Sequence, residues 1–121
     1  MTRTRVDERE RGTAVGAVQQ VSEAEFQKEV LEAPVPVVVD FFAVWCGPCR
    51  LITPILDDLS KTYDGKVKFV KVDIDDAPGI AERFAVANVP TLVAFKAGEE
   101  ADRRVGAAPK PALEGWVKSF V

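Results

Sequence analysis

The sequence contains no histidine and only two cysteines among its 121 residues. The missing imidazole removes the commonest general base and metal ligand, and two sulfurs alone cannot complete a four-ligand zinc or iron site. We therefore expect no metal. Because the two cysteines are three positions apart, a bond between them would close a very short loop and stabilise the fold little. The two cysteines are therefore predicted to be reactive groups and not a structural crosslink.

Long apolar runs and a strong excess of one charge are also missing. The 16 basic and 19 acidic side chains leave a net charge of -3, which excludes a basic footprint for nucleic acid or acidic lipid. No stretch is apolar enough to span a membrane, and residues 1–11 mix arginine with acidic residues, unlike a secretory signal or transit peptide. We expect a cytoplasmic protein with a flexible tail at residues 1–14 and one domain at 15–121.

Apolar periodicity predicts an alternation of strands and helices. Residues 35–42 are apolar on both faces and rich in β-branched and aromatic residues, which indicates a central strand. Ser22 and Glu25 have the spacing of a capping box, so a helix is expected from Ser22 to Glu32. Similar signals give strands at 16–21, 67–73, 91–96 and 101–105 and helices at 46–63, 78–84 and 113–120. This order predicts an α/β fold with a mixed sheet and helices on both faces.

The two cysteines, Cys46 and Cys49, stand where the predicted central strand ends and a helix begins. The free amides and the dipole of a helix N-terminus favour a thiolate, so Cys46 is the predicted nucleophile. Cys49 lies one turn deeper and is expected to be less exposed, which makes it the resolving thiol. Gly47 leaves room for a partner's backbone, and Pro48 restricts the turn. Such a pair can also be structural or metal-binding, but its place between strand and helix favours redox chemistry.

The segment VDFFAVWCGPC at residues 39–49, together with Val-Pro-Thr at 89–91, closely resembles the thioredoxin family. Asp40, Pro54, residues 71–73 and residues 95–98 match as well, so the resemblance covers about the last hundred residues. It implies a thioredoxin fold of about five strands and four helices. It also implies that the dithiol form reduces protein disulfides, that the redox group is a Cys46–Cys49 disulfide without a bound cofactor, and that thioredoxin reductase regenerates it. We expect a monomer that carries electrons in cell redox homeostasis.

Two residues depart from the family pattern, and two other functions are compatible with a fold of this kind. Phe42 stands where the family usually has a second tryptophan, and Asn88 stands where glycine is common, which could change the substrate groove. A redox-independent binding or assembly subunit would use the same fold without sulfur chemistry. An oxidase or isomerase of an oxidising compartment is disfavoured by the Gly-Pro pair and the missing secretory signal.

Two charged residues are candidates for supporting roles. Asp40 shares a strand face with Val38 and Phe42, so desolvation should raise its pKa and let it exchange a proton with the Cys49 thiol. From the residues alone a structural carboxyl is equally plausible, and the resemblance favours the catalytic role. Lys71 would place a cation near Asp40, although a solvated lysine fits the pattern as well.

A substrate groove is implied by the resemblance. It implies a cis peptide bond before Pro90, next to which an extended substrate can pair as an added strand. The acidic residues at 73–76 do not form a calcium-binding loop, because the required glycine and glutamate are absent. The remaining residues that match the partner-binding rim of relatives are Trp45, Gly47, Pro48, Ile74, Val89, Gly106 and Ala107.

Overall fold

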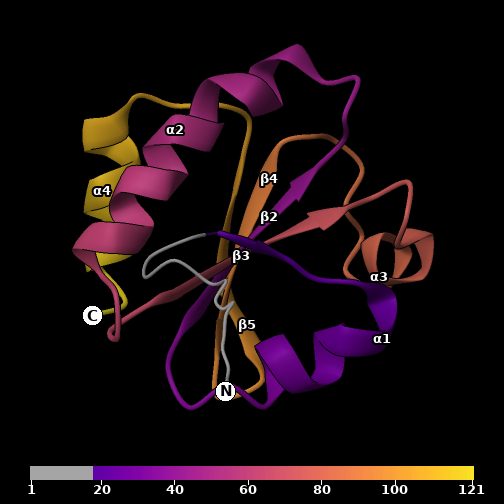
Figure 1. Ribbon diagram of the computed structural model, residues 1–121, viewed down its shortest axis with the longest axis horizontal. Helices are drawn as coiled ribbons and strands as arrows, with labels where there is room; N and C mark the ends of the chain where they lie inside the picture. The colour runs from indigo at the N-terminus through magenta and orange to yellow at the C-terminus, as the bar shows by residue number, and fades with distance from the viewer. Residues whose placement is uncertain (1–17) are drawn as a thin grey trace, which may run out of the picture.

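Five strands form one mixed sheet in the computed structural model, which describes residues 18–121. Helices cover both faces of the sheet, with α2 and α4 on one side and α1 and α3 on the other (Figure 1). The elements are β1 (Gln19–Gln20), α1 (Glu23–Phe26), η1 (Gln27–Leu31), β2 (Val37–Phe42), α2 (Gly47–Thr62), β3 (Lys68–Asp73), α3 (Pro78–Arg83), β4 (Thr91–Lys96), β5 (Glu99–Val105) and α4 (Lys110–Lys118). The predicted fold class is confirmed. The predicted tail at 1–14 and the first residues of the strand at 16–21 lie outside the described residues.

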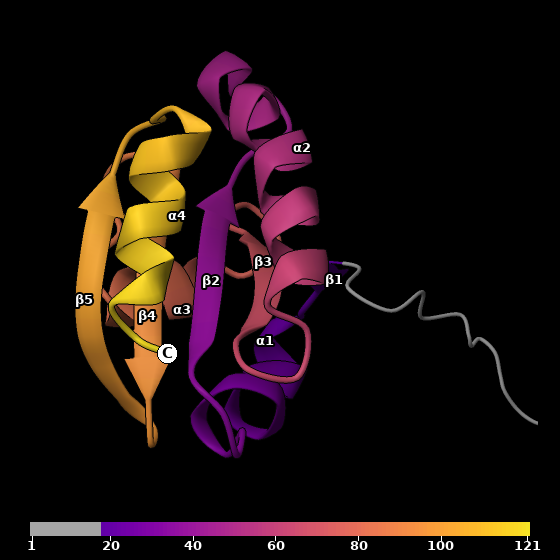
Figure 2. The same ribbon diagram turned by 90° about the vertical axis from the view of Figure 1, so that its left-hand side faces the viewer.

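The strand order is β1-β3-β2-β4-β5, so β2 is central (Figure 2). It runs parallel to β3 and antiparallel to β4, and five of its six residues are buried. Helices cover both of its faces, which is why every residue of the strand except Asp40 is apolar, with no alternation of apolar and polar positions. The prediction of a central strand in this segment is confirmed.

A separate apolar cluster fills each side of the sheet. Beneath α1 and α3, the rings of Phe26, Phe84 and Phe95 pack in tilted and edge-to-face arrangements with centroids 5.1 to 5.7 Å apart. Beneath α2 and α4, the cluster includes the helical residues Ile52, Leu56, Leu59, Leu113 and Trp116. These helices therefore bury the apolar stripes that their sequences predicted. Between residues 18 and 121 no helix has the length and apolar content that crossing a bilayer requires.

The first helix begins as predicted and then changes type. The Glu25 N–H donates to Ser22 Oγ at 3.2 Å, and the Ser22 N–H donates to Glu25 Oε1 at 3.0 Å, which completes the capping box. From Gln27 to Leu31 the turn widens to a π-helix, a difference from the expected α-helix. The Lys68 ammonium donates to the carbonyl of Glu29 at 2.9 Å and so provides a partner for the backbone in this wider turn.

Four chain segments meet at one end of the sheet because of the strand directions. The end of β2 lies opposite the start of β4, with Phe41 paired to Thr91, and Thr91 also pairs with Val105 at the end of β5. The Ile74 N–H, just after β3, donates to the carbonyl of Phe42 at 3.0 Å. Figure 2 shows α2 starting beyond the arrowhead of β2, at this same end. The loops after β2, β3 and β5 and the loop before β4 are thereby brought together.

Candidate active site

Cys46 and Cys49 lie at the start of α2 and form a disulfide, with their Cα atoms 5.4 Å apart. Cys46 is the N-cap residue of the helix, in extended conformation, and Pro48 occupies the first turn. The backbone N–H of Cys49 donates to the Cys46 sulfur at 3.1 Å. One of the unpaired amides of the helix N-terminus is therefore directed at Cys46, where it would stabilise negative charge on the sulfur.

The two cysteines do not differ in exposure as expected. Cys46 is 4% exposed and Cys49 is 3% exposed in the disulfide form. Both pack with Ala43, and the partly buried side chains of Ile74 and Val89 lie against this cluster. Both residues are almost completely buried in this state, so their exposed fractions do not separate the two predicted roles. The capping position of Cys46 is what distinguishes the two residues in the structure.

Asp40 is a buried carboxyl in the middle of β2. It is 4% exposed, and its Oδ1 has no hydrogen-bond partner within residues 18–121. Burial raises its pKa from 3.8 to about 7, and the positive charge of Lys71 opposes the rise. The carboxyl borders a cavity of about 10 Å³, close to the room that one water molecule needs. The cavity is lined by Val18, Asp40, Thr53, Leu56, Asp57 and Lys71.

Lys71, on β3, lines the same cavity as Asp40. It pairs with Asp40 across the parallel strands, and its Nζ lies 5.6 Å from the centroid of the Phe42 ring. A cation does lie near Asp40, as the strand pattern suggested, although its role in catalysis stays a prediction. Phe42 keeps the apolar packing of the position, because its half-buried ring lies against the cysteine cluster as well as beneath Lys71.

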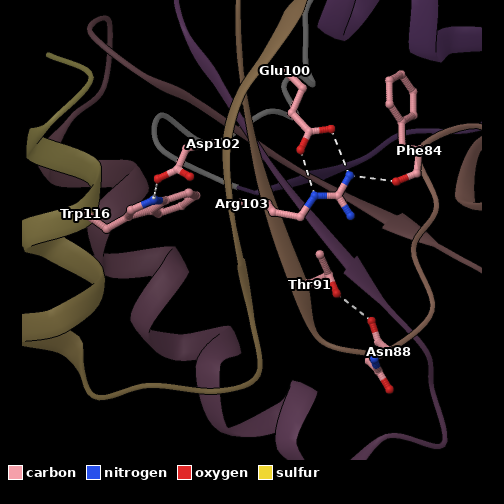
Figure 3. Close-up of polar contacts among 7 residues, drawn as sticks. All are labelled: Phe84, Asn88, Thr91, Glu100, Asp102, Arg103 and Trp116. Atoms are coloured by element: carbon pink, nitrogen blue, oxygen red, sulfur yellow. Dashed lines mark hydrogen bonds and ion pairs between the residues drawn. The ribbon is translucent and has the colours of Figure 1, made fainter.

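The loop before β4 contains a cis peptide bond between Val89 and Pro90, as the resemblance implied. Val89 packs against the cysteine cluster, and the carbonyl of Pro90 accepts the Gly106 N–H at 2.8 Å. Asn88 is exposed, and its carbonyl accepts the Thr91 hydroxyl at 2.6 Å (Figure 3). Asn88 is not among the residues with positive φ, so its backbone does not require the glycine that is common in the family.

The predicted rim residues come together around the two sulfurs. Gly47 and Pro48 lie between the cysteines, Ile74 and Val89 pack against them, and Gly106 is bonded to the Pro90 carbonyl. Ala107 follows Gly106 and is exposed, and Trp45 is 65% exposed beside Cys46. Their shared location is now established, and their role in substrate binding stays a prediction.

Three further residues, one beside Trp45 and two at the Asp40 cavity, were not identified from the sequence. Asp75 accepts the indole N–H of Trp45 at 2.9 Å, across thirty positions of the chain. Thr53 and Asp57 line the cavity at Asp40, and the Thr53 hydroxyl donates to the carbonyl of Cys49 at 3.1 Å. From the sequence, Asp75 was considered only as a possible metal ligand, because it belongs to the acidic cluster at 73–76. Thr53 and Asp57 gave no signal beyond their positions four and eight residues after Cys49 on α2.

Comparisons with known proteins agree with this geometry. The thioredoxin family model matches residues 17–119. The chain is 43% identical to a thioredoxin of Synechocystis sp. over 88% of this chain and 100% of that protein. It is 46% identical to thioredoxin 1 of Nostoc sp., over 82% of this chain and 92% of the relative. It is also 46% identical to chloroplastic thioredoxin M4 of Arabidopsis thaliana, over 86% of this chain and 54% of the relative. The chain therefore belongs to the thioredoxin family, and with its Cys46–Cys49 pair it is a thiol-disulfide oxidoreductase, a redox carrier that reduces protein disulfides.

Proposed function

We propose that Cys46 attacks the disulfide of a substrate protein and that Cys49 resolves the product. The Cys46 thiolate displaces one substrate sulfur and forms a mixed disulfide, and the displaced sulfur leaves as a thiolate. Cys49 then loses its proton and attacks the Cys46 sulfur, which releases the second substrate thiolate. The substrate gains two electrons, and the protein is left with an oxidised Cys46–Cys49 disulfide. A reductase then reduces this disulfide back to the dithiol.

The observation that supports Cys46 as the attacking residue is the hydrogen bond from the Cys49 N–H to the Cys46 sulfur. A donor at 3.1 Å on a helix N-terminus stabilises a thiolate more than a thiol. Cys49 follows within the first turn of α2, where its own sulfur has no such position at the helix cap. The thiolate therefore forms preferentially on Cys46, and Cys46 is the first sulfur to react.

Asp40 is the proposed acceptor of the proton that Cys49 must release. A general base works best when its pKa lies near the working pH, and burial brings Asp40 to about 7. The cavity beside the carboxyl is large enough for one water, and Thr53, which lines it, donates its hydroxyl to the carbonyl of Cys49. Lys71 is the proposed regulator of this base, because its positive charge favours the ionised carboxylate.

The substrate is proposed to bind over Trp45, Ile74 and the loop from Asn88 to Pro90. Exposed apolar and backbone groups next to the sulfurs suit an extended peptide around a cystine. Gly47, Pro48, Gly106 and Ala107 complete the surface and add little side-chain bulk near the sulfurs. The proposed partners are therefore disulfide-containing proteins together with thioredoxin reductase.

The proposed setting is the cytoplasm, where a reductase can keep the dithiol form available. A chloroplastic relative makes this compartment worth testing by cell fractionation. The protein is proposed to act as a monomer, since a large partner must reach the sulfurs. Sedimentation at micromolar concentration would measure the oligomeric state.

Two cysteine variants test the proposed roles. Cys46→Ser should abolish reduction of insulin, whereas Cys49→Ser should still attack substrates and accumulate as a mixed disulfide, visible by mass spectrometry. Limiting iodoacetamide applied to the reduced wild type should label Cys46 before Cys49. Preferential labelling of Cys49, or trapping by Cys46→Ser instead, would reverse the two roles.

A further inference from the structure

The loop from Ala85 to Pro90 joins the end of α3 to the start of β4 and carries part of the proposed groove. Its last residues lie next to the sulfurs, because Val89 packs against the cluster of Cys46 and Cys49. Its first residue, Ala85, has a φ of 55°, in the left-handed region that costs a side-chain-bearing residue about 1 kcal/mol. The Ala85 and Val86 N–H groups close this turn by donating to the carbonyls of Glu82 at 3.0 Å and Ala81 at 2.8 Å.

Arg103 on β5 supplies a contact at the start of the loop. Its Nη2 donates to the carbonyl of Phe84 at 2.7 Å, at the C-terminal end of α3 (Figure 3). This carbonyl belongs to the last turn of the helix, where backbone acceptors lack helical partners and a cation is favourable. The contact joins residues nineteen positions apart, and no local sequence pattern predicts it.

Glu100 fixes the direction of the Arg103 guanidinium. Arg103 Nε donates to one carboxylate oxygen at 2.7 Å, and Nη2 donates to the other at 2.8 Å. This two-point pairing defines the plane of the guanidinium, so Nη2 is held toward the carbonyl of Phe84. Both side chains are about one-third exposed, at 30% and 32%, so the pair lies at the surface of the sheet edge, open to substitution.

The rest of the loop is anchored independently of Arg103. The ring of Phe84 is packed between Phe26 and Phe95, and the Thr91 hydroxyl holds the Asn88 carbonyl. The Gly106 N–H holds the carbonyl of Pro90. With the ring and the far end fixed, the Arg103 contact defines the orientation of the Phe84 peptide and thereby the direction in which the loop leaves α3.

We propose that Arg103 is a positioning residue for protein substrates. By holding the Phe84 carbonyl it fixes how the loop leaves α3 and, together with the contacts at Asn88 and Pro90, restricts the motion of the residues that lie beside the sulfurs. The inference rests on the proposed function, because it assumes that substrates bind along this loop. Arg103 touches neither cysteine in the described structure, so it acts on the affinity for proteins and leaves the reactivity of the sulfurs unchanged.

Two substrates of different size distinguish a change in the affinity for proteins from a change in the reactivity of the sulfurs. Insulin must occupy the groove, whereas the small aromatic disulfide DTNB needs access to Cys46 alone. Arg103→Ala should raise the KM for insulin several-fold, up to about tenfold, with kcat nearly unchanged, because a bound loop conformation must be selected from a more mobile one. Its rate with DTNB should equal that of wild type. Hydrogen exchange at the amides of Ala85 and Val86 should accelerate.

Arg104→Ala is the matched control, because it removes the same charge from the next residue of β5 and leaves the Phe84 contact intact. It should behave as wild type with both substrates. Arg103→Lys keeps the positive charge on one donor nitrogen but loses the planar fork, so its KM for insulin should lie between those of wild type and Arg103→Ala. If Arg103→Ala does not fold, the comparison of Arg103→Lys with wild type tests the proposal.

The outcomes separate this inference from the proposed function. An insulin KM unchanged in both Arg103 variants would overturn the positioning role, as would equal losses with insulin and DTNB. Failure of wild type to reduce insulin, or full activity in Cys46→Ser, would overturn the proposed function and with it this inference. An insulin-specific rise in KM, with partial rescue by lysine, supports the role of Arg103.

Discussion

Asp40 and Lys71 are paired across the parallel strands β2 and β3, and both border one small cavity beneath α2. They lie beyond the contact distance of an ion pair, since no bridge between them is found in residues 18–121. The lysine therefore acts on the carboxyl through the field across the cavity. The desolvation of the carboxyl raises its pKa by more than the charge of Lys71 lowers it, so the pKa of Asp40 is raised to about 7.

We expect Asp40→Asn to be more stable than wild type at pH 8 and to turn over more slowly. The unfolded carboxyl loses its proton near pH 3.8 and the folded one near 7, so wild type loses stability as pH rises between these values. The loss is on the order of 4 kcal/mol, at about 1.4 kcal/mol per pKa unit. Asparagine does not ionise and avoids it. Denaturant melts of the oxidised protein from pH 4 to 9 measure the difference.

The kinetic half of this prediction needs a separate measurement. Without the carboxylate, Cys49 lacks its proton acceptor, so resolution of the mixed disulfide should slow while the first attack by Cys46 stays normal. Single-turnover experiments at pH 7 resolve the two steps. Parallel stability curves for variant and wild type would show that Asp40 is solvated, and normal resolution would remove it from the mechanism.

Lys71→Met should raise the pKa of Asp40 above its value of about 7. The substitution removes the positive charge that favours the carboxylate, while the methionine side chain can still pack on the Phe42 ring. The side-chain carboxyl carbon of Asp40, followed by NMR across pH 5 to 10, reports the midpoint. The exposed Lys66, replaced in the same way, serves as the control and should leave the midpoint unchanged.

Asp75→Ala should weaken reduction of insulin by freeing the Trp45 indole. The indole N–H donates to Asp75 at 2.9 Å, and an exposed bond of this kind contributes about 1 kcal/mol to fixing the ring. The indole proton of Trp45 should shift in the NMR spectrum, and the insulin KM should rise several-fold. Asp76→Ala removes a neighbouring charge and should change neither. An unmoved indole signal in Asp75→Ala would mean that the bond is not formed in solution.

Two glycines should respond in opposite directions to alanine. Gly98, in the β4–β5 turn, has a φ of 81°, and an added Cβ would lie 3.0 Å from the carbonyl oxygen of Leu31. Gly98→Ala should therefore destabilise the protein by about 1 to 2 kcal/mol. Gly115 lies inside α4 with open space at its Cβ position, so Gly115→Ala should stabilise by about 0.5 to 1 kcal/mol. Urea melts of both variants decide the signs.

Features encoded within a few residues were predictable from the sequence. The apolar run of β2, the capping box at Ser22 and the position of Cys46 at a helix start each follow from local patterns. The burial of Asp40 followed from the alternation of strand side chains among apolar neighbours. The cis bond before Pro90 did not follow from its neighbours and was predicted only through family resemblance.

Features that depend on packing between distant segments were not predictable. The near-complete burial of Cys46 depends on loops that contribute Ile74 and Val89, and its position along the chain did not predict that burial. The partner of Trp45 lies thirty residues away, and the Arg103 contact joins two elements that only the sheet order brings together. The π-helical turn at 27–31 likewise has the same apolar spacing as an ordinary helix.

The two outer strands of the sheet influence how the molecule behaves in a crowded solution. In the described part of the chain, β1 is only two residues long, and β5 reads Glu-Glu-Ala-Asp-Arg-Arg-Val. A very short edge and a heavily charged edge both discourage strand pairing with other copies, which is a common route to aggregation. With both edges protected in this way, the proposed groove at Val89, beside the sulfurs, is where we expect backbone pairing with a substrate chain.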